Sequence, residues 1–245
     1  MTTHLAELWT HLTRTPLLGV LVTIAAYLLA QRIHATFDRK AWANPVAIAI
    51  VLLAVLLAVT RTPYEAYFEG ARLIHVLLGP ATVALAVPLF EQRRRLRRLA
   101  VPLALALVAG VVAAIISAVG IGWLLGGTRS TLLSLASKSV TAPVAMSIAQ
   151  SIGAVPALTV VLAIGTGITG ALLALPVLRW LRIDCHATSG FALGLAAHGI
   201  GTARAYQINE EKGAFAGLAM CLTAIAYALV APWLAPSLVG LLPMR

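Results

Sequence analysis

Residues 196–204, Ala-Ala-His-Gly-Ile-Gly-Thr-Ala-Arg, bring a histidine, two glycines, a threonine and an arginine together in an otherwise apolar part of the chain. An ionisable side chain at membrane depth is costly and usually marks a transport pathway or a binding site. Glycines that interrupt a membrane helix release backbone N–H and C=O groups, which is tolerated only where these groups face protein or water. The stretch therefore predicts one half of a binding site for a small anion.

The residues of this stretch differ in how directly they indicate an anion. Gly199 and Gly201 would let the helix unwind, and Thr202 would offer a hydroxyl. Arg204 would offer two parallel N–H donors to a carboxylate. The alternative is that Arg204 pairs with one of the acidic residues near the outer surface, Glu210 or Glu211.

His198 also allows two interpretations. Its charge changes near neutral pH, so it could relay a proton during transport. The alternative is a structural histidine that is hydrogen-bonded within the helix bundle.

A second polar stretch, Ser-Lys-Ser-Val-Thr-Ala-Pro, covers residues 137–143. Pro143 lacks an N–H group and its ring clashes with the preceding turn, so a helix must break or kink near residue 140. The half-helix that follows would begin with unpaired N–H donors and partial positive charge. Lys138, Ser139 and Thr141 lie beside these donors, and together they suit a carboxylate. In the alternative, Lys138 reaches the lipid headgroups and Pro143 only kinks the helix.

Residues 78–89 contain two prolines eight residues apart and predict another discontinuous helix. This stretch would contribute Thr82 and freed carbonyl groups to the site but no charge. Simple kinking without ligand contact is the alternative.

The composition sets the class of protein. Of the 245 residues, 60% are hydrophobic and 11% are charged, and the mean hydropathy is +0.94. Soluble proteins carry about 25% charged residues. We therefore expect an all-α, multi-pass integral membrane protein that forms a single domain over residues 1–245.

The apolar runs predict about seven or eight membrane segments, since about 20 residues span the hydrocarbon core. Their bounds are 16–31, 45–60, 68–90, 99–125, 130–152, 156–178, 188–208 and 214–241.

Positive charge gathers in alternate loops. Residues 32–40, 93–98 and 179–182 and the C-terminal Arg245 carry eleven of the eighteen lysine and arginine residues. This positive-inside pattern places those loops in the cytoplasm, and it explains the net charge of +10 without nucleic acid binding.

The chain also shows a weak internal repeat at an offset of about 120 residues, in which Gly79 aligns with Gly199 and Thr82 with Thr202. Basic loops in one copy match nearly uncharged loops in the other, which predicts an inverted repeat with halves at 15–125 and 130–242. The charges fit if 130–152 is a re-entrant hairpin, with the N-terminus outside the cell and the C-terminus inside.

Enzyme motifs are absent from the sequence. It holds no HExxH zinc motif, Walker loop or nucleophile elbow, and most of its eight acidic residues lie in loops. We therefore expect no enzymatic activity, no metal site and no cofactor.

The polar stretches together resemble the LrgB (CidB/LrgB) family of bacterial membrane proteins, in the order and spacing of 78–89, 138–145, 151–156, 198–204 and 211–214. The chain departs from the family pattern at three positions. Ser137 stands where the family has proline, Ala142 where it has threonine, and Ala197 where it often has serine. The alanines at 142 and 197 remove possible hydroxyl ligands, and the differences bear on substrate specificity.

The resemblance implies two classes of function. One is transport of small monocarboxylates such as pyruvate, glycolate or glycerate across the bacterial inner membrane. The other is an antiholin-like role in murein hydrolase export and lysis, with a small LrgA-type membrane partner. The residues favour an alternating-access transporter, because a pore regulator has no evident need for a broken helix that bears Lys138. By analogy with compact transporters we expect a homodimer in the lipid bilayer.

Overall fold

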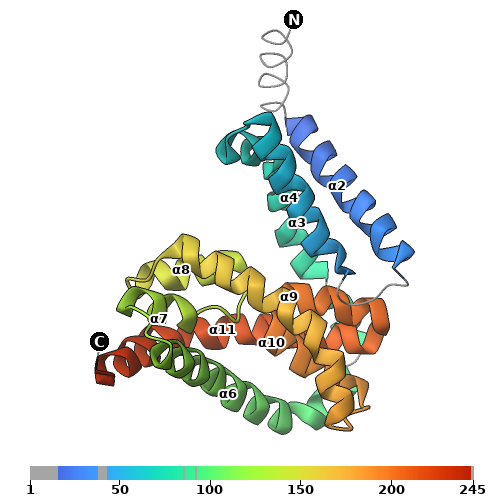
Figure 1. Ribbon diagram of the computed structural model, residues 1–245. Helices are drawn as coiled ribbons and strands as arrows, with labels where there is room; N and C mark the ends of the chain where they lie inside the picture. Colours follow the sequence, from blue (N-terminus) through green and yellow to red (C-terminus); the bar gives the residue numbers. More distant parts are fainter. Residues whose placement is uncertain (1–15, 38–42, 85, 92, 244–245) are drawn as a thin grey trace, which may run out of the picture. The chain divides into compact units, whose positions relative to one another are not determined.

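The described elements of the protein are all α-helices, as the sequence predicts (Figure 1). The computed structural model describes residues 16–37, 43–84, 86–91 and 93–243, and the side chains of several residues within its helices, Thr82 among them, lie outside that description. The chain forms two compact units, residues 1–84 (unit 1) and 85–245 (unit 2). The single domain and its repeat halves stay predictions.

Unit 1 contains α2 (Pro16–Thr36), α3 (Pro45–Thr60) and α4 (Tyr64–Ala84), and α2 packs on both of the others. Gly19 allows α2 to approach α4 closely, since a Cβ there would lie 2.5 Å from the backbone nitrogen of Ala71. The hydroxyls of Thr23 and Tyr67 are 2.8 Å apart and join the same two helices. The side chain of Asn44 caps α3 by accepting from two backbone N–H groups.

Unit 2 contains the remaining helices, among them all but one of the predicted site residues. They are α5 (Ala86–Glu91), α6 (Arg93–Leu124), α7 (Arg129–Ala136), α8 (Ala142–Ser151), α9 (Pro156–Trp180), α10 (His186–Ile208) and α11 (Glu210–Leu241).

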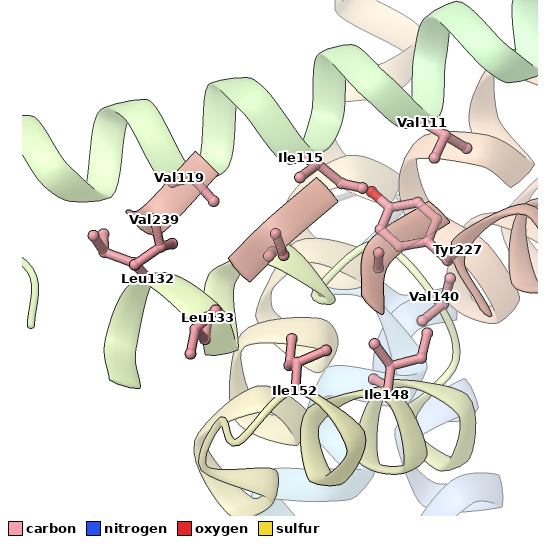
Figure 2. Packing of buried hydrophobic residues seen from close by; sticks show 14 of the residues in the cluster. Val111, Ile115, Val119, Leu132, Leu133, Val140, Ile148, Ile152, Tyr227 and Val239 are labelled. Carbon is pink, nitrogen blue, oxygen red and sulfur yellow. The ribbon is translucent and has the colours of Figure 1, made fainter. Parts of the chain in front are cut away.

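The core of unit 2 lies where α6, α7, α8 and α11 meet (Figure 2). Val111, Ile115 and Val119 line one face of α6 at four-residue spacing, as expected of a helix that buries one stripe. Tyr227 of α11 is 1% exposed and lies in the same cluster. The indole N–H of Trp123 donates to the carbonyl of Pro243 at 2.9 Å, which fastens the end of α6 to the end of the chain.

Helices α7 and α8 form a hairpin. They contain 8 and 10 residues, so each rises only about 12–15 Å and neither crosses a hydrocarbon core of about 30 Å. The backbone N–H of Val155, beyond the end of α8, donates to the hydroxyl of Ser134 in α7 at 3.1 Å. The chain therefore turns at residues 137–141, and the segment just after α8 comes back to α7. That this segment is re-entrant in a membrane stays a prediction.

The helices α10 and α11 are in close backbone contact, and two glycines make this contact possible. A Cβ at Gly190 would collide with the carbonyl group of Lys212, and a Cβ at Gly194 would collide with that of Ala216. This Gly-x-x-x-Gly spacing is a common device for close packing of membrane helices. It holds α10 firmly along α11.

Four helices of the described chain are long and apolar enough to cross a membrane, and they cover 18–36, 97–124, 156–180 and 210–241. The 16-residue α3 is apolar but shorter. The predicted total of seven or eight segments and the inverted repeat stay predictions.

Candidate functional site

The turn of the hairpin carries the predicted polar residues of the stretch 137–143. The expected break is confirmed, because α7 ends at Ala136 and α8 begins only at Ala142. Pro143 sits in the first turn of α8, where its missing N–H group costs no hydrogen bond. Thr141 is the N-cap residue, yet its side chain makes no capping bond. The N-terminal N–H groups of α8 are thus left without the hydroxyl that would ordinarily satisfy one of them.

The second predicted break lies within α10 and centres on His198. The sequence predicted unwinding at the glycines, but the non-helical residue is the histidine itself, with φ 39° and ψ −130°. A non-glycine residue in such a region costs about 1–3 kcal/mol, so the surrounding structure must enforce it. Gly201 serves close approach instead, because a Cβ there would lie 2.7 Å from the carbonyl oxygen of Leu193.

The imidazole of His198 is held by α9. Its Nε2 donates to the carbonyl oxygen of Ala163 at 2.9 Å, and the residue is 5% exposed. Gly167 makes room for the ring, since a Cβ at that position would lie 2.7 Å from Cε1 of His198. This arrangement fixes the tautomer and leaves Nδ1 as the nitrogen that can take up a proton.

The turn of the hairpin meets the break of α10. A methyl group on Gly199 would lie 3.9 Å from Cγ2 of Thr141, and Lys138 is close enough to His198 for the lysine charge to act on the imidazole. The ammonium group of Lys138 lies 3.4 Å from the hydroxyl of Ser139. Two interrupted helices that are distant in sequence therefore place their polar residues side by side.

Helix α11 completes this cluster with residues that the sequence analysis missed. The hydroxyl of Tyr227 lies close to the side chain of Ser139. The Thr202 hydroxyl donates to the carbonyl of His198 at 2.9 Å, and it lies 3.9 Å from the sulfur of Met220. Met220, Thr223 and Tyr227 occur at i, i+3 and i+7, so they share one face of α11. That hydroxyl-bearing stripe in an apolar helix is the signal that could have revealed them.

Several polar atoms in and beside the cluster are buried without a hydrogen-bond partner. Ser137 and Thr223 are 0% and 1% exposed, and the hydroxyl group of each makes no hydrogen bond. Most buried polar groups in proteins are paired, so orphaned ones call for an explanation. A polar guest bound among them would supply the missing partners.

Arg204 and Thr82 are not joined to this cluster by any described contact. Arg204 lies six residues beyond His198, about 9 Å further along α10. Its Nη1 donates to Oε1 of Gln207 at 3.0 Å, while its Nε is buried without a partner. The side chain of Thr82 lies outside the described part of the structure.

The cluster, here called the hairpin–α10 site, combines the ammonium of Lys138, the imidazole of His198, hydroxyls of Ser139 and Thr141, and the N-terminus of α8. Donors predominate in this set, and no carboxylate belongs to it. Charge-assisted hydrogen bonds from such donors favour an anion over a cation.

The comparisons with known proteins relate the chain to one family and to several bacterial proteins. The model of the LrgB-like family matches residues 23–237. The chain is 36% identical to the uncharacterized protein YwbG of Bacillus subtilis over 89% of its own length and 96% of the relative. It is 28% identical to the holin-like protein CidB of Staphylococcus epidermidis over 88% of its length and 93% of the relative. No solved structure matches the chain.

The family match spans most of the sequence and includes both broken helices and all four candidate membrane spans in part or in whole. The apolar helices of the chain and its holin-like relatives together indicate a multi-pass membrane protein. The expected resemblance is thus confirmed, and the chain belongs to the LrgB-like family.

Proposed function

We propose that this protein is an alternating-access transporter of small organic monocarboxylates in the bacterial inner membrane, and that it functions as a homodimer. The observation that carries the proposal is the meeting of two interrupted helices at the hairpin–α10 site. The approach of Thr141 to Gly199 supports that meeting, since a methyl group on Gly199 would lie 3.9 Å from Cγ2 of Thr141. The charge of Lys138 also acts on the imidazole of His198.

The chemistry of the site supports a carboxylate as the substrate. One carboxylate would accept from the Lys138 ammonium and from the unpaired N–H groups at the start of α8. The Ser139 and Thr141 hydroxyls lie beside those donors and suit the same group. The single lysine at the site favours one negative charge, hence a monocarboxylate over a dicarboxylate.

Helix breaks at the middle of a transporter commonly hold the substrate while one part of the protein moves against another. The break at His198 separates two helical portions of α10, and the turn at 137–141 separates α7 from α8. A substrate held between them would couple to movement of the hairpin. Protonation of His198 at Nδ1 would add a positive charge beside the substrate, which makes proton coupling a natural extension of the proposal.

Uptake of radiolabelled pyruvate into proteoliposomes tests the proposal. Lys138→Ala removes a charge-assisted hydrogen bond, so we expect the apparent affinity to fall about 10- to 100-fold. The matched control is Arg129→Ala, which removes a positive charge from the exposed start of the same hairpin and should leave uptake near the wild-type level. Arg204→Ala asks whether the half-buried guanidinium also belongs to the substrate path.

Uptake by these variants distinguishes a specific anion site from a general effect of positive charge. Wild-type uptake by both the Lys138 and the Arg204 variants, purified as folded protein, would exclude an anion site built on these residues. Glycolate, glycerate and acetate in the same assay define the substrate class. A ligand that binds the folded state also raises its melting temperature, which gives an independent readout.

A second candidate is an antiholin-like regulator of murein hydrolase export that acts with a small LrgA-type membrane partner. It is favoured by the relatives from Staphylococcus, which are named holin-like proteins. The two functions make different demands on Lys138. A regulator that does not transport should keep its effect on lysis in the Lys138→Ala variant, whereas a regulator that acts through transport should lose it.

A further inference from the structure

An apolar groove runs between α6 and α10 of unit 2, and it is lined by none of the residues of the hairpin–α10 site. It has a volume of about 430 Å³, and Leu99, Pro102, Ala106, Phe191 and Leu195 are among the residues that line it. Along α6 it extends from Leu99 to Gly110, which corresponds to about 17 Å. This length is close to the thickness of one leaflet, since the full hydrocarbon core measures about 30 Å.

A basic cavity of about 510 Å³ adjoins the groove at its end near the start of α6. Arg94 and Arg98 line this cavity together with Cys185, and Leu99 and Thr188 line both the cavity and the groove. The polar mouth and the apolar groove are therefore continuous. We call the combined space the α6/α10 groove.

The charges at the mouth are arranged for a phosphate. Arg94 and Arg98 are four residues apart on α6, so their side chains lie on the same face of the helix. Helix α10 begins at His186 beside the mouth, with Cys185 as its N-cap residue. Guanidinium groups bind phosphate oxygens with paired hydrogen bonds, and a helix N-terminus adds partial positive charge. The described lining residues of the mouth include no carboxylate that would neutralise the two arginines.

The position of the mouth matches the depth of lipid headgroups. The apolar span of α6 begins at Arg97, between Arg94 and Arg98 and just before Leu99, where the groove starts. The second basic loop, with Arg179 and Arg182, precedes Cys185 by a few residues and so adjoins the same mouth. Basic pockets at the cytoplasmic ends of membrane helices attract anionic lipids.

We propose that the α6/α10 groove binds one acidic phospholipid, with its phosphate at Arg94 and Arg98 and one acyl chain along the apolar faces of α6 and α10. A helix of a partner protein would fill the apolar part equally well but would leave both guanidinium groups without a counter-charge. The continuity of a two-arginine mouth with a groove one leaflet long favours the lipid.

Native mass spectrometry of the purified full-length protein tests this inference. The protein is titrated with phosphatidylglycerol and, separately, with phosphatidylcholine of the same acyl chains. We expect a saturable single adduct with phosphatidylglycerol and at least tenfold weaker binding of phosphatidylcholine. The double variant Arg94→Gln/Arg98→Gln should weaken phosphatidylglycerol binding about ten- to thirtyfold.

Two controls separate a site from general attraction. The double variant Arg97→Gln/Arg129→Gln removes the same charge from exposed arginines that do not line the mouth, and it should bind phosphatidylglycerol as the wild type does. Ala106→Phe fills the groove and should reduce binding, whereas Ala104→Phe, at an exposed position of α6 outside the lining, should not. Inorganic phosphate at millimolar concentration should fail to displace the lipid, because it lacks the acyl chain.

Equal loss in the two arginine double variants, equal binding of the two lipids, or unchanged binding in Ala106→Phe would each overturn the proposal. A protein helix that co-purifies and occupies the groove in place of lipid would overturn it as well. Melting temperatures of the variants in detergent without added lipid establish that they are folded. If the Arg94→Gln/Arg98→Gln variant does not fold, the proposal is tested by comparing phosphatidylglycerol binding of Ala106→Phe with that of Ala104→Phe.

Discussion

At the scale of single residues, the site depends on a histidine held in an unfavourable backbone conformation. His198 adopts φ 39° in the middle of α10, and its ring donates to the carbonyl of Ala163 on α9. Gly167, one turn beyond Ala163, leaves the space that the imidazole occupies. The strained backbone of His198 is thus maintained by contacts with another helix. A substitution on α9 should therefore alter the position of His198 and the function of the site.

Gly167→Ala tests this dependence. The added methyl group would lie 2.7 Å from Cε1 of His198 and 2.8 Å from Cδ1 of Ile200, so the ring must shift or lose its bond to Ala163. We expect a loss of about 1–3 kcal/mol in stability and a clear fall in pyruvate uptake. The measurements are the melting temperature and proteoliposome uptake.

Gly165→Ala is the matched control on the same helix. A Cβ at Gly165 meets nothing within 4 Å, and alanine favours a helix over glycine by about 1 kcal/mol. This variant should keep wild-type uptake with equal or higher stability. An uptake defect as large as that of Gly167→Ala would contradict the assigned role of the His198 pocket.

At the scale of elements, the hairpin of α7 and α8 presents its turn to the break in α10. Neither helix is long enough to be stable alone, so the hairpin depends on the core it forms with α6 and α11 and on the bond between Ser134 and Val155. Ser134 is fully buried and occupies the inside of the hairpin. Its hydroxyl is the polar link between the two ends of this segment.

Ser134→Ala should loosen the hairpin. The substitution leaves the backbone N–H of Val155 without its acceptor, which costs about 1–3 kcal/mol. We expect a lower melting temperature and faster amide exchange over residues 142–155, measured by hydrogen–deuterium exchange. Ser147→Ala is the control, because Ser147 is exposed and bonds only to Pro143 within α8. Equal exchange in the two variants would show that the bond does not hold the hairpin closed.

At the scale of the whole molecule, the charge distribution predicts which side of unit 2 faces the cytoplasm. The loops 93–98 and 179–182 carry much of the positive charge, and the mouth of the α6/α10 groove brings the start of α6 next to Cys185, just beyond the second loop. Two basic loops that the sequence assigned to one side of the membrane therefore adjoin one cavity. This agreement supports the predicted orientation.

Labelling of Cys185 tests the orientation directly. In a Cys221→Ser background the exposed thiol of Cys185 should react with a membrane-impermeant maleimide in inside-out vesicles and not in intact cells. The control, Glu210→Cys in a background without either native cysteine, places a thiol at the exposed start of α11 and should show the reverse pattern. Labelling of Cys185 from outside intact cells would refute the assignment.

The sequence by itself determined the features that depend on local chemistry. Apolar composition dictated helices in a membrane, Pro143 dictated a helix break before α8, and the polar stretches around Lys138 and His198 revealed the family. These features follow from backbone geometry and burial costs that act over a few residues, so they can be read along the chain.

Only the tertiary structure decided which residues meet. It located the α10 break at His198, since the strain is imposed by α9 and cannot be inferred from neighbouring glycines. It added Tyr227, which lies close to Ser139, and it placed Arg204 beside Gln207. Contacts between helices depend on their packing angle and register, which are set by many weak interactions across the whole core, and local sequence does not encode them in readable form.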